Sequence, residues 1–415
     1  MPFLKLKKNE MIKVFGPMLV IVKKGLIDIL GKKAKENEQI IIHKIRSYVI
    51  RSLDDTELDI NMTPDAQIQA VEETDPYLEW YKKAEEIIKE EPGKIMILGG
   101  VDNGKSSYTV LLSNIALEQN LKPALIDADV GQADIGPPGF ISMAYPNEQT
   151  IWMRTLKPVS MRFIGDIKPQ IHTQAIIGKT RELAMKALKD SRKPVIIDTD
   201  GWVGDTYAFI YKSRMIEDIK PDIVVVIGNE LKGLFKKYEK IGIKVVELPA
   251  PTLRRTRSRE ERRALRSDKY REFLLDAKSL KISLDEIVVS GHPLFMGIPL
   301  DPNEITNTVG AKVLYASRTP DTVFIVLAEQ PKNIRLDELK KVIGVPKARC
   351  HVQGFEKNMY VGLVGENGDE YPGIIEKIDY VEKTITLKTK YTGKIKMIKT
   401  SKMKLSPEFT ELLME

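Results

Sequence analysis

Residues 94–108 read KIMILGGVDNGKSSY, and this stretch decides the fold. The apolar run at 94–98 has the length and composition of a buried strand, and a helix is expected from Lys105 onward. Between them, Gly99–Ser106 match the P-loop pattern GxxxxGK(S/T) at every fixed position, in the strand–loop–helix order that this pattern requires. A glycine-rich turn that matches by chance is the alternative, and the coincidence of strand, loop and helix argues against it.

A P-loop predicts a binding site for the phosphates of ATP or GTP. Successive backbone N–H groups of such a loop point inward, and the positive end of the following helix attracts anions. Lys105 is expected to reach the β- and γ-phosphates, serving phosphate rather than the core, and the Ser106 hydroxyl is expected to ligate Mg²⁺. The predicted nucleotide-binding residues are Gly99, Gly100, Val101, Asp102, Asn103, Gly104, Lys105, Ser106 and Ser107.

The sequence around the P-loop predicts an α/β fold. Further short apolar runs, typical of buried strands, alternate with helical stretches. The expected strands lie at 123–127, 194–198 and 222–227, and the expected helices near 105–119, 171–189 and 205–217. This alternation indicates a mainly parallel sheet with helices on both faces.

The length of 415 residues exceeds what one hydrophobic core organises, so two or three domains are expected, and the pattern along the chain predicts three. Residues 1–75 comprise an N-terminal β domain, in which apolar and polar residues alternate, and a polar linker from Asn61 to Asp75. A helix that opens at Asp75-Pro76 begins the P-loop domain, residues 76–279, which carries an arginine-rich lid. Residues 280–415 have a strand-and-turn texture and are expected to form a C-terminal β-rich domain.

Composition excludes several classes of protein. No apolar run approaches the roughly 20 residues that span a bilayer, and the first residues lack the layout of a signal peptide, so we expect a cytoplasmic protein without membrane contact. One cysteine, Cys350, and four histidines without metal-ligand spacing argue against a disulfide and a zinc site. Any metal is therefore expected to be a hard cation. The formal charge of +7 permits a polyanionic partner.

Carboxylates follow two of the expected strands. Asp127 and Asp129 end the second strand, where ligands of open α/β sheets bind. Asp129, further along the turn, is predicted to contact Mg²⁺ or act as general base, with Asp127 as a second candidate metal ligand; a solvated pair of turn aspartates is the alternative. The third strand leads into Asp198-Thr199-Asp200-Gly201-Trp202, where Trp202 either packs in the loop or offers a platform for base stacking.

An arginine-rich segment at 254–271 contains eight arginines. Ser258-Arg259-Glu260-Glu261 forms a capping-box sequence, so a helix is expected to start with Ser258 as its N-cap. Arg257 and Arg262 then occupy the two positions that a hydrophobic staple normally brings together. Two cations placed there favour an anion between them, such as a transferring phosphoryl group. A solvated helix with surface ion pairs is the alternative.

These motifs, in this order, resemble the polynucleotide 5′-hydroxyl kinase family of RNA processing. Gly99–Ser106 match its P-loop, and Asp127-x-Asp129-x-Gly131-Gln132 match its DxDxGQ element. Thr199-x-Gly201-Trp202 match its TxGW clasp, and the segment from Arg257 to Arg271 resembles its lid. Two departures put acceptor contacts in doubt: Lys168 replaces a serine, and Asp198 stands where relatives often have asparagine.

The resemblance implies an enzyme that transfers the γ-phosphate of ATP or GTP to the 5′-hydroxyl end of RNA, with DNA as an additional candidate acceptor. It implies Mg²⁺ as cofactor, RNA-processing proteins as partners, and catalytic roles for Lys105, Asp129, Arg257 and Arg262. It also implies acceptor or phosphate contacts by Gln132, Thr199 and Trp202. Two other classes stay open on the residues alone: a nucleotide-switch ATPase or GTPase of the deviant Walker type, and a scaffold that binds nucleotide only to stabilise its fold.

Overall fold

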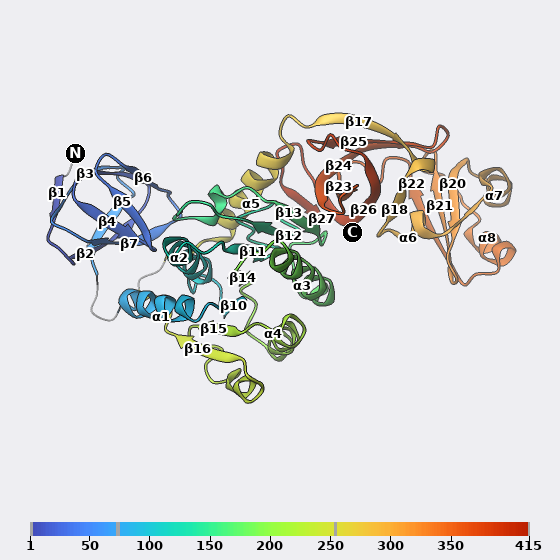
Figure 1. Ribbon diagram of the computed structural model, residues 1–415. Helices are drawn as coiled ribbons and strands as arrows, with labels where there is room; N and C mark the ends of the chain where they lie inside the picture. Colours follow the sequence, from blue (N-terminus) through green and yellow to red (C-terminus); the bar gives the residue numbers. More distant parts are fainter. Residues whose placement is uncertain (1–2, 72–74, 253–254, 414–415) are drawn as a thin grey trace. The chain divides into compact units, whose positions relative to one another are not determined.

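The computed structural model describes residues 3–71, 75–252 and 255–413, and the chain divides into two compact units. The first unit contains Met1–Ser160 and Ile167–Leu265, and the second contains Met161–Asp166 and Arg266–Glu415. Figure 1 labels the elements of both units along the chain. The predicted boundaries at residues 75 and 279 remain predictions.

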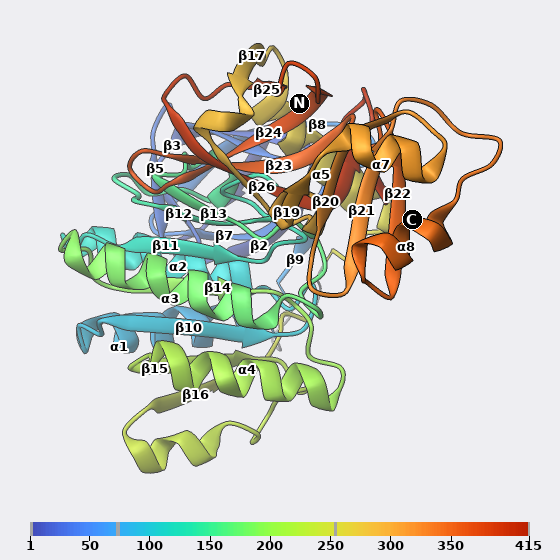
Figure 2. The ribbon, with the colours of Figure 1, turned by 90° about the vertical axis from the view of Figure 1, so that its right-hand side faces the viewer.

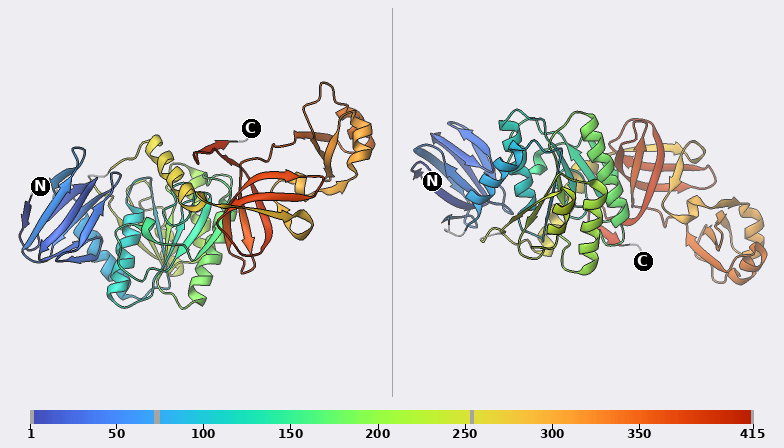
Figure 3. Two further views of the ribbon diagram at one scale, coloured as in Figure 1. Left: turned by 90° about the horizontal axis from the view of Figure 1, so that it is seen from above. Right: turned by 60° about the horizontal axis from the view of Figure 1, so that its bottom comes forward.

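The first unit begins with two antiparallel sheets. One has the order β1 (Phe3–Leu6), β8 (Thr56–Met62), β3 (Met18–Lys24), β6 (Gln39–Ile42). The other has the order β5 (Lys32–Lys35), β4 (Leu26–Ile29), β7 (Ser47–Ser52), β2 (Met11–Phe15), β9 (Gln67–Ala70). Buried and partly exposed residues alternate along β3 and β8, as expected for strands with one face in the core. These strands form the N-terminal blue part of the chain in Figure 3.

The predicted linker from Asn61 to Asp75 is wrong in part. Residues Gln67–Ala70 form strand β9, which pairs with β2 along its length. The polar composition misled the prediction, because β9 lies at a sheet edge and is held by backbone hydrogen bonds rather than by a buried side-chain face. Residues 72–74 of the predicted linker lie outside the described residues.

The P-loop follows a strand in the middle of a mainly parallel sheet. Within the first unit the order is β12 (Phe140–Ala144), β11 (Ala124–Ala128), β14 (Val195–Thr199), β10 (Lys94–Gly99), β15 (Ile223–Ile227), β16 (Lys244–Leu248). All neighbours are parallel except β11 and β12. Figure 2 shows α3 (Thr173–Lys189) and α4 (Thr206–Ile219) on one face of the sheet, with α1 (Tyr77–Lys89) and α2 (Lys105–Glu118) on the other. The predicted α/β fold is confirmed.

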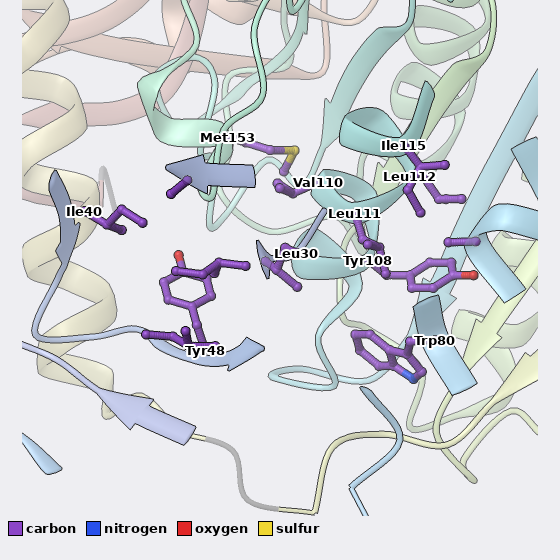
Figure 4. Packing of buried hydrophobic residues seen from close by; sticks show 14 of the residues in the cluster. Leu30, Ile40, Tyr48, Trp80, Tyr108, Val110, Leu111, Leu112, Ile115 and Met153 are labelled. Carbon is purple, nitrogen blue, oxygen red and sulfur yellow. The ribbon is translucent and has the colours of Figure 1, made fainter. Parts of the chain in front are cut away.

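One continuous hydrophobic core joins the N-terminal sheets to the P-loop helix. Leu30 and Tyr48 belong to the same buried cluster as Leu111 and Ile115 of α2 (Figure 4). The Asn114 side chain also donates a 2.7 Å hydrogen bond to the carbonyl of Leu30. Helix α2 is therefore covered on one side by its own sheet and on another by the N-terminal sheets, which explains why every residue from Tyr108 to Ala116 is buried.

The second unit is rich in strands, as predicted. Its main sheet has the order β17 (Lys278–Ser283), β25 (Thr384–Thr389), β24 (Glu370–Asp379), β23 (Met359–Gly365), β26 (Ile395–Leu405), β18 (Val288–Ser290), and β27 (Glu411–Leu413) pairs with β26. A second sheet has the order β19 (Ile298–Leu300), β20 (Val313–Arg318), β21 (Thr322–Leu327), β22 (Lys347–Val352).

The second unit also contains helices that the sequence did not predict. They are α6 (Pro293–Met296), α7 (Pro302–Val309) and α8 (Leu336–Ile343). Helices α7 and α8 pack on the smaller sheet and share a separate hydrophobic core with it. Their shortness hid them, because eight residues give barely two turns of helical periodicity. None of the helices among the described residues is long and apolar enough to cross a membrane.

Candidate active site at the P-loop

The P-loop presents the open amino end of α2. Gly104, the N-cap of this helix, has φ +93°, and a Cβ there would lie 2.6 Å from a ring atom of Trp80. Glycine is therefore required by both conformation and space. No side chain among the described residues caps α2, so the backbone donors of its first turn are left for an anion.

Lys105 is buried, with 7% of its surface exposed, and its Nζ donates a 2.8 Å hydrogen bond to the carbonyl of Gly100. The ammonium group is thus turned onto its own loop. Its positive charge acts to lower the pKa values of the Asp129 and Asp198 carboxylates, against the effect of their burial. Lys105 was expected to serve phosphate and to lie outside the core. Its side chain is buried, but it bonds a backbone carbonyl of the P-loop and is not part of the hydrophobic core.

The two carboxylates that end β11 have different surroundings. Asp127 is buried, and its Oδ2 accepts hydrogen bonds from the backbone N–H groups of Asp134 and Ile135, at 2.6 and 3.0 Å. Its Oδ1 accepts from the Asp129 N–H at 3.2 Å. Burial, followed by the neighbouring carboxylates, raises the pKa of Asp127 well above its ordinary value. Asp127 therefore organises the loop after β11 with both of its oxygens.

Asp129 follows β11 and is partly exposed. Its Oδ1 accepts backbone hydrogen bonds from Gly131 and Gln132, both at 2.9 Å. Burial and the Asp200 carboxylate raise the pKa of Asp129 against the opposing effect of those bonds and of Lys105. The Gln132 side chain bonds the carbonyl of Gly131 at 3.1 Å and so lies along the same loop.

Asp198, which stands where relatives often have asparagine, also lies at this candidate site, although no function was predicted for it from the sequence. It pairs in register with Asp127 on the neighbouring parallel strand, and it is 2% exposed. Its Oδ1 is buried without a hydrogen-bond partner among the described residues, while the carboxylate interacts with the Ser106 hydroxyl. Burial raises the pKa of Asp198 to about 7, against the opposing effects of Lys105 and Ser106. The sequence shows that the expected strands 123–127 and 194–198 both end in aspartate, but only the assembled sheet shows that these strands are neighbours.

The segment after β14 lies against the P-loop. A Cβ on Gly201 would come within 2.9 Å of the Val101 backbone, so only glycine fits this approach. Trp202 is partly exposed, stacks on Tyr211 with ring centroids 5.9 Å apart, and donates from Nε1 to Asp205 at 2.8 Å. The buried hydroxyl of Thr199 donates to the Ile97 carbonyl at 2.8 Å, a bond that ties β14 to β10.

A buried ion pair holds this segment in place. The Asp200 carboxylate accepts hydrogen bonds from Lys212 Nζ at 2.8 Å, from the Tyr211 hydroxyl at 3.0 Å and from the Trp202 N–H at 3.0 Å. Lys212 is completely buried, and burial lowers its pKa against the attraction of Asp200. The backbone that carries Trp202 is therefore anchored to helix α4.

The arginine-rich segment forms helix α5 (Arg259–Leu274) with the predicted capping box. The Ser258 hydroxyl accepts from the Glu261 N–H at 3.1 Å, and the Glu261 carboxylate accepts from the Ser258 N–H at 3.0 Å. Arg257 and Arg262 are brought together, as predicted, and an anion lies between them. That anion is the carboxylate of Asp102, in the P-loop, at 2.9 Å from Arg257 Nη2 and 2.8 Å from Arg262 Nη2.

The other arginines of α5 differ from these two. Arg263 is exposed, whereas Arg266 belongs to the second unit and forms a two-bond ion pair with Glu411, with Nε 2.6 Å from Oε1. The helix continues across the boundary between the units, at Leu265 and Arg266. The contacts described with the P-loop come from Arg257, just before the helix, and from Arg262 in its first turn.

The site thus combines an open P-loop, carboxylates at the ends of two neighbouring parallel strands, and a pair of arginines from a following helix, all within one unit. This combination defines a P-loop phosphotransferase, an enzyme class that binds ATP. A family model described as mRNA cleavage and polyadenylation factor CLP1 P-loop matches residues 99–275. The chain belongs to the polyribonucleotide 5′-hydroxyl-kinase family, as its similarity to curated archaeal proteins shows.

Among those relatives is the polyribonucleotide 5′-hydroxyl-kinase of Pyrococcus furiosus, 33% identical over 307 residues that cover 72% of this chain and 83% of that protein. The one from Methanocaldococcus jannaschii is 31% identical over 310 residues, covering 72% of this chain and 82% of that protein. The solved structure of Clp1p in its complex with Pcf11p has a TM-score of 0.65 at 13% identity, covering 97% of this chain and 98% of that chain. The last comparison shows a shared fold.

Substitution of Asp198 is expected to stabilise the nucleotide-free protein. The pKa of Asp198 is about 7 in the folded state and near 3.8 in its ordinary state, so the charged group disfavours folding. The penalty grows as the pH rises from about 4 and is complete above about 7. In metal-free buffer at pH 8, Asp198→Asn should therefore raise the free energy of unfolding by roughly 1–3 kcal/mol, allowing for relaxation around the buried site. Thermal or urea unfolding measures this difference.

At pH 4 the same substitution should stabilise the protein much less, because Asp198 is then protonated in the folded state and a large fraction of it is protonated in the unfolded chain as well. Asp218→Asn is the matched control, since Asp218 is an exposed partner of Arg181 at 3.0 Å. A stabilisation by Asp198→Asn that is equal at pH 4 and pH 8 would contradict an electrostatic origin.

Proposed function

We propose that this chain phosphorylates the 5′-hydroxyl end of RNA, with ATP or GTP as the donor. The observation that carries the proposal is the convergence of Lys105, Asp129 and the Arg257–Arg262 pair on one P-loop. Two guanidinium groups beside the P-loop suit phosphoryl transfer, since negative charge spreads over the moving group in its transition state. A nucleotide switch that hydrolyses ATP can also use such arginines, so RNA as the acceptor is inferred from the curated 5′-hydroxyl kinases that the chain resembles.

The proposed roles follow from chemistry and position. The N–H groups of Gly99–Ser107 and the first turn of α2 hold the donor phosphates, and Lys105 exchanges its bond to Gly100 for phosphate oxygens. Arg257 and Arg262 neutralise charge on the transferring group. Asp129, which is partly exposed, orients the attacking hydroxyl or accepts its proton. Gln132 lies on the same loop and is proposed to contact phosphate or bound water.

Residues at this site also suit Mg²⁺. Three carboxylates lie near the ends of two neighbouring strands. Burial, first of all, and other carboxylates raise the pKa values of Asp127, Asp129 and Asp198, and Asp198 Oδ1 lacks a hydrogen-bond partner among the described residues. We propose that Ser106, Asp129 and Asp198 hold the ion, directly or through water. Asp127, the other predicted ligand, uses both oxygens on backbone N–H groups and is the weaker candidate. The ion would supply charge neutralisation between donor phosphates.

The proposed acceptor site includes Trp202. Its indole is anchored by Asp205 and Tyr211 yet partly exposed, which suits stacking of an RNA base. Thr199 is proposed to act indirectly, because its hydroxyl bonds the Ile97 carbonyl inside the sheet. Partner proteins of RNA processing and the use of DNA as an acceptor stay predictions.

The test is incubation of the purified protein with γ-labelled ATP and an RNA that carries a 5′-hydroxyl. Label on the 5′ end of the RNA supports the proposed kinase, free labelled phosphate points to a nucleotide switch, and neither product points to a scaffold. The same RNA with a 5′-phosphate is the control acceptor and must remain unlabelled. A DNA acceptor and a GTP donor, tested in parallel, define the preferences.

Replacement of Trp202 should weaken acceptor use more than donor binding. If one RNA base stacks on the indole, Trp202→Ala should raise KM for RNA by about 5- to 150-fold, equivalent to about 1–3 kcal/mol. KM for ATP should change little, since no phosphate contact is proposed for Trp202. Trp202→Phe retains an aromatic face and should restore most of the loss. A weaker affinity for ATP with unchanged KM for RNA would assign Trp202 to the donor side.

A further inference from the structure

The carboxylate of Asp102 lies where two cations of the lid meet the P-loop. Oδ1 accepts hydrogen bonds from Arg257 Nε and Nη2 at 3.1 and 2.9 Å, and Oδ2 accepts from Arg262 Nη2 at 2.8 Å. The carboxylate is only 6% exposed, and the guanidinium groups are 21% and 27% exposed. Although burial acts to raise its pKa, the two guanidinium groups hold the pKa of Asp102 below its ordinary value.

Asp102 also holds the backbone of the lid. The Arg257 N–H donates to Oδ2 at 3.3 Å, so the residue just before the N-cap of α5 is fixed as well as its side chain. Asp102 is itself held in a left-handed conformation with φ +58°. Its neighbour Asn103 is buried and bonds the Ile227 carbonyl at 3.1 Å and Glu230 at 3.0 Å. The contact therefore joins the start of the lid to a firmly held part of the P-loop.

Two arginines and one carboxylate leave one net positive charge over the phosphate cradle. A guanidinium group has five N–H donors, and these contacts use two nitrogen atoms of Arg257 and one of Arg262. Moreover, Arg262 Nε is buried and lacks a hydrogen-bond partner among the described residues. Burying a charged donor without an acceptor costs free energy of folding. An anionic phosphate oxygen bound at the P-loop is an acceptor that would satisfy Arg262 Nε.

We propose that Asp102 is a positioning residue that orients Arg257 and Arg262 toward the transferring phosphoryl group. It bonds some of the N–H donors of the two guanidinium groups and leaves the others for phosphate oxygens. This inference rests on the proposed kinase function. Asp102 contacts the arginines rather than the reacting atoms, so its effect on turnover passes through them. Misplacement of such groups by about 1 Å is enough to cost roughly 100-fold in rate. A carboxylate that merely competed with phosphate for the arginines would have the opposite effect on turnover.

The test is a double-mutant cycle with Asp102→Asn and the paired variant Arg257→Ala/Arg262→Ala. Asparagine keeps the shape and tolerates the left-handed conformation, so the loop should fold. In the wild-type background, Asp102→Asn should lower kcat about 10- to 100-fold with a smaller change in KM for ATP. In the arginine-free background, it should lower kcat less than about 3-fold, because residues that act as one unit are not additive. Glu260→Gln, an exposed carboxylate of the same helix turn, is the control and should leave kcat unchanged.

A second readout is the affinity for ADP with Mg²⁺ and aluminium fluoride, which mimics the transferring phosphoryl group. Asp102→Asn should weaken this affinity about 10-fold in the wild-type background and not in the arginine-free one. If the wild-type protein fails to label RNA, the proposed function falls, and this binding cycle still decides the role of Asp102. Higher turnover of Asp102→Asn, or an equal loss in both backgrounds, would overturn the inference.

Discussion

Lys105→Ala should abolish labelling of 5′-hydroxyl RNA, with a fall in kcat of at least about 100-fold. Loss of one preorganised charge at a site of developing negative charge typically costs about 2.7–4 kcal/mol. Lys105 is well placed for that role, because it is buried at the amino end of α2 and bonds only a carbonyl of its own loop in the contacts described. Single-turnover kinetics with γ-labelled ATP measures the loss.

Stability must be followed in parallel, because Lys105 also faces the buried carboxylates. Its charge opposes the raised pKa values of Asp129 and Asp198, so the alanine variant should unfold at a lower temperature in metal-free buffer. Lys105→Arg keeps that charge and should recover the stability, but its planar head cannot follow the compact ammonium into the loop, so activity should stay low. Near-normal kinase activity in a folded Lys105→Ala protein would contradict the proposed role of Lys105 in phosphoryl transfer at the P-loop.

The core of the fold was accessible from the sequence because its signals are local. The P-loop motif predicts a strand, a turn and a helix within fifteen residues. The strands expected at 123–127, 194–198 and 222–227 correspond to β11, β14 and β15. The family, the fold class and the enzyme class are confirmed. The sheet order and the edge strand β9 depend instead on partners far along the chain, and no periodicity within a few residues encodes them.

The site residues also divide into those with a local sequence signal and those whose position depends on partners far along the chain. The capping box of α5 was predicted because it spans four residues, and the structure contains both of its hydrogen bonds. The anion between Arg257 and Arg262 was expected to be a phosphoryl group, yet it is Asp102, which lies 155 and 160 positions away in sequence. Asp198 was overlooked for a related reason. Its proposed role depends on its register beside Asp127, and register is a property of the assembled sheet.

Arg257→Ala and Arg262→Ala should each lower kcat by about 10³-fold or more, with little change in affinity for RNA. An arginine finger contributes about 10³–10⁵-fold in related phosphoryl transfer, and a shared role places each single loss toward the lower end. The structure supports this outcome because both guanidinium groups are fixed beside the P-loop by Asp102 rather than spread over a surface. Arg→Lys at either position should rescue poorly, since lysine lacks the planar fork that serves carboxylate and phosphate together.

The control for this prediction follows from the structure. Arg266 pairs with Glu411, so its replacement would test stability rather than charge, whereas Arg263 is exposed on the same helix. If the segment were only a basic surface, all three alanine variants, including Arg263→Ala, would raise KM for RNA alike, and high salt would reproduce the defect in the wild-type protein. A lid instead predicts that kcat falls for Arg257→Ala and Arg262→Ala at both low and high salt, while Arg263→Ala stays near the wild type. Measurement of kcat and KM at two salt concentrations separates the two, because screening acts on long-range attraction of RNA and hardly on groups already in contact with the moving phosphoryl.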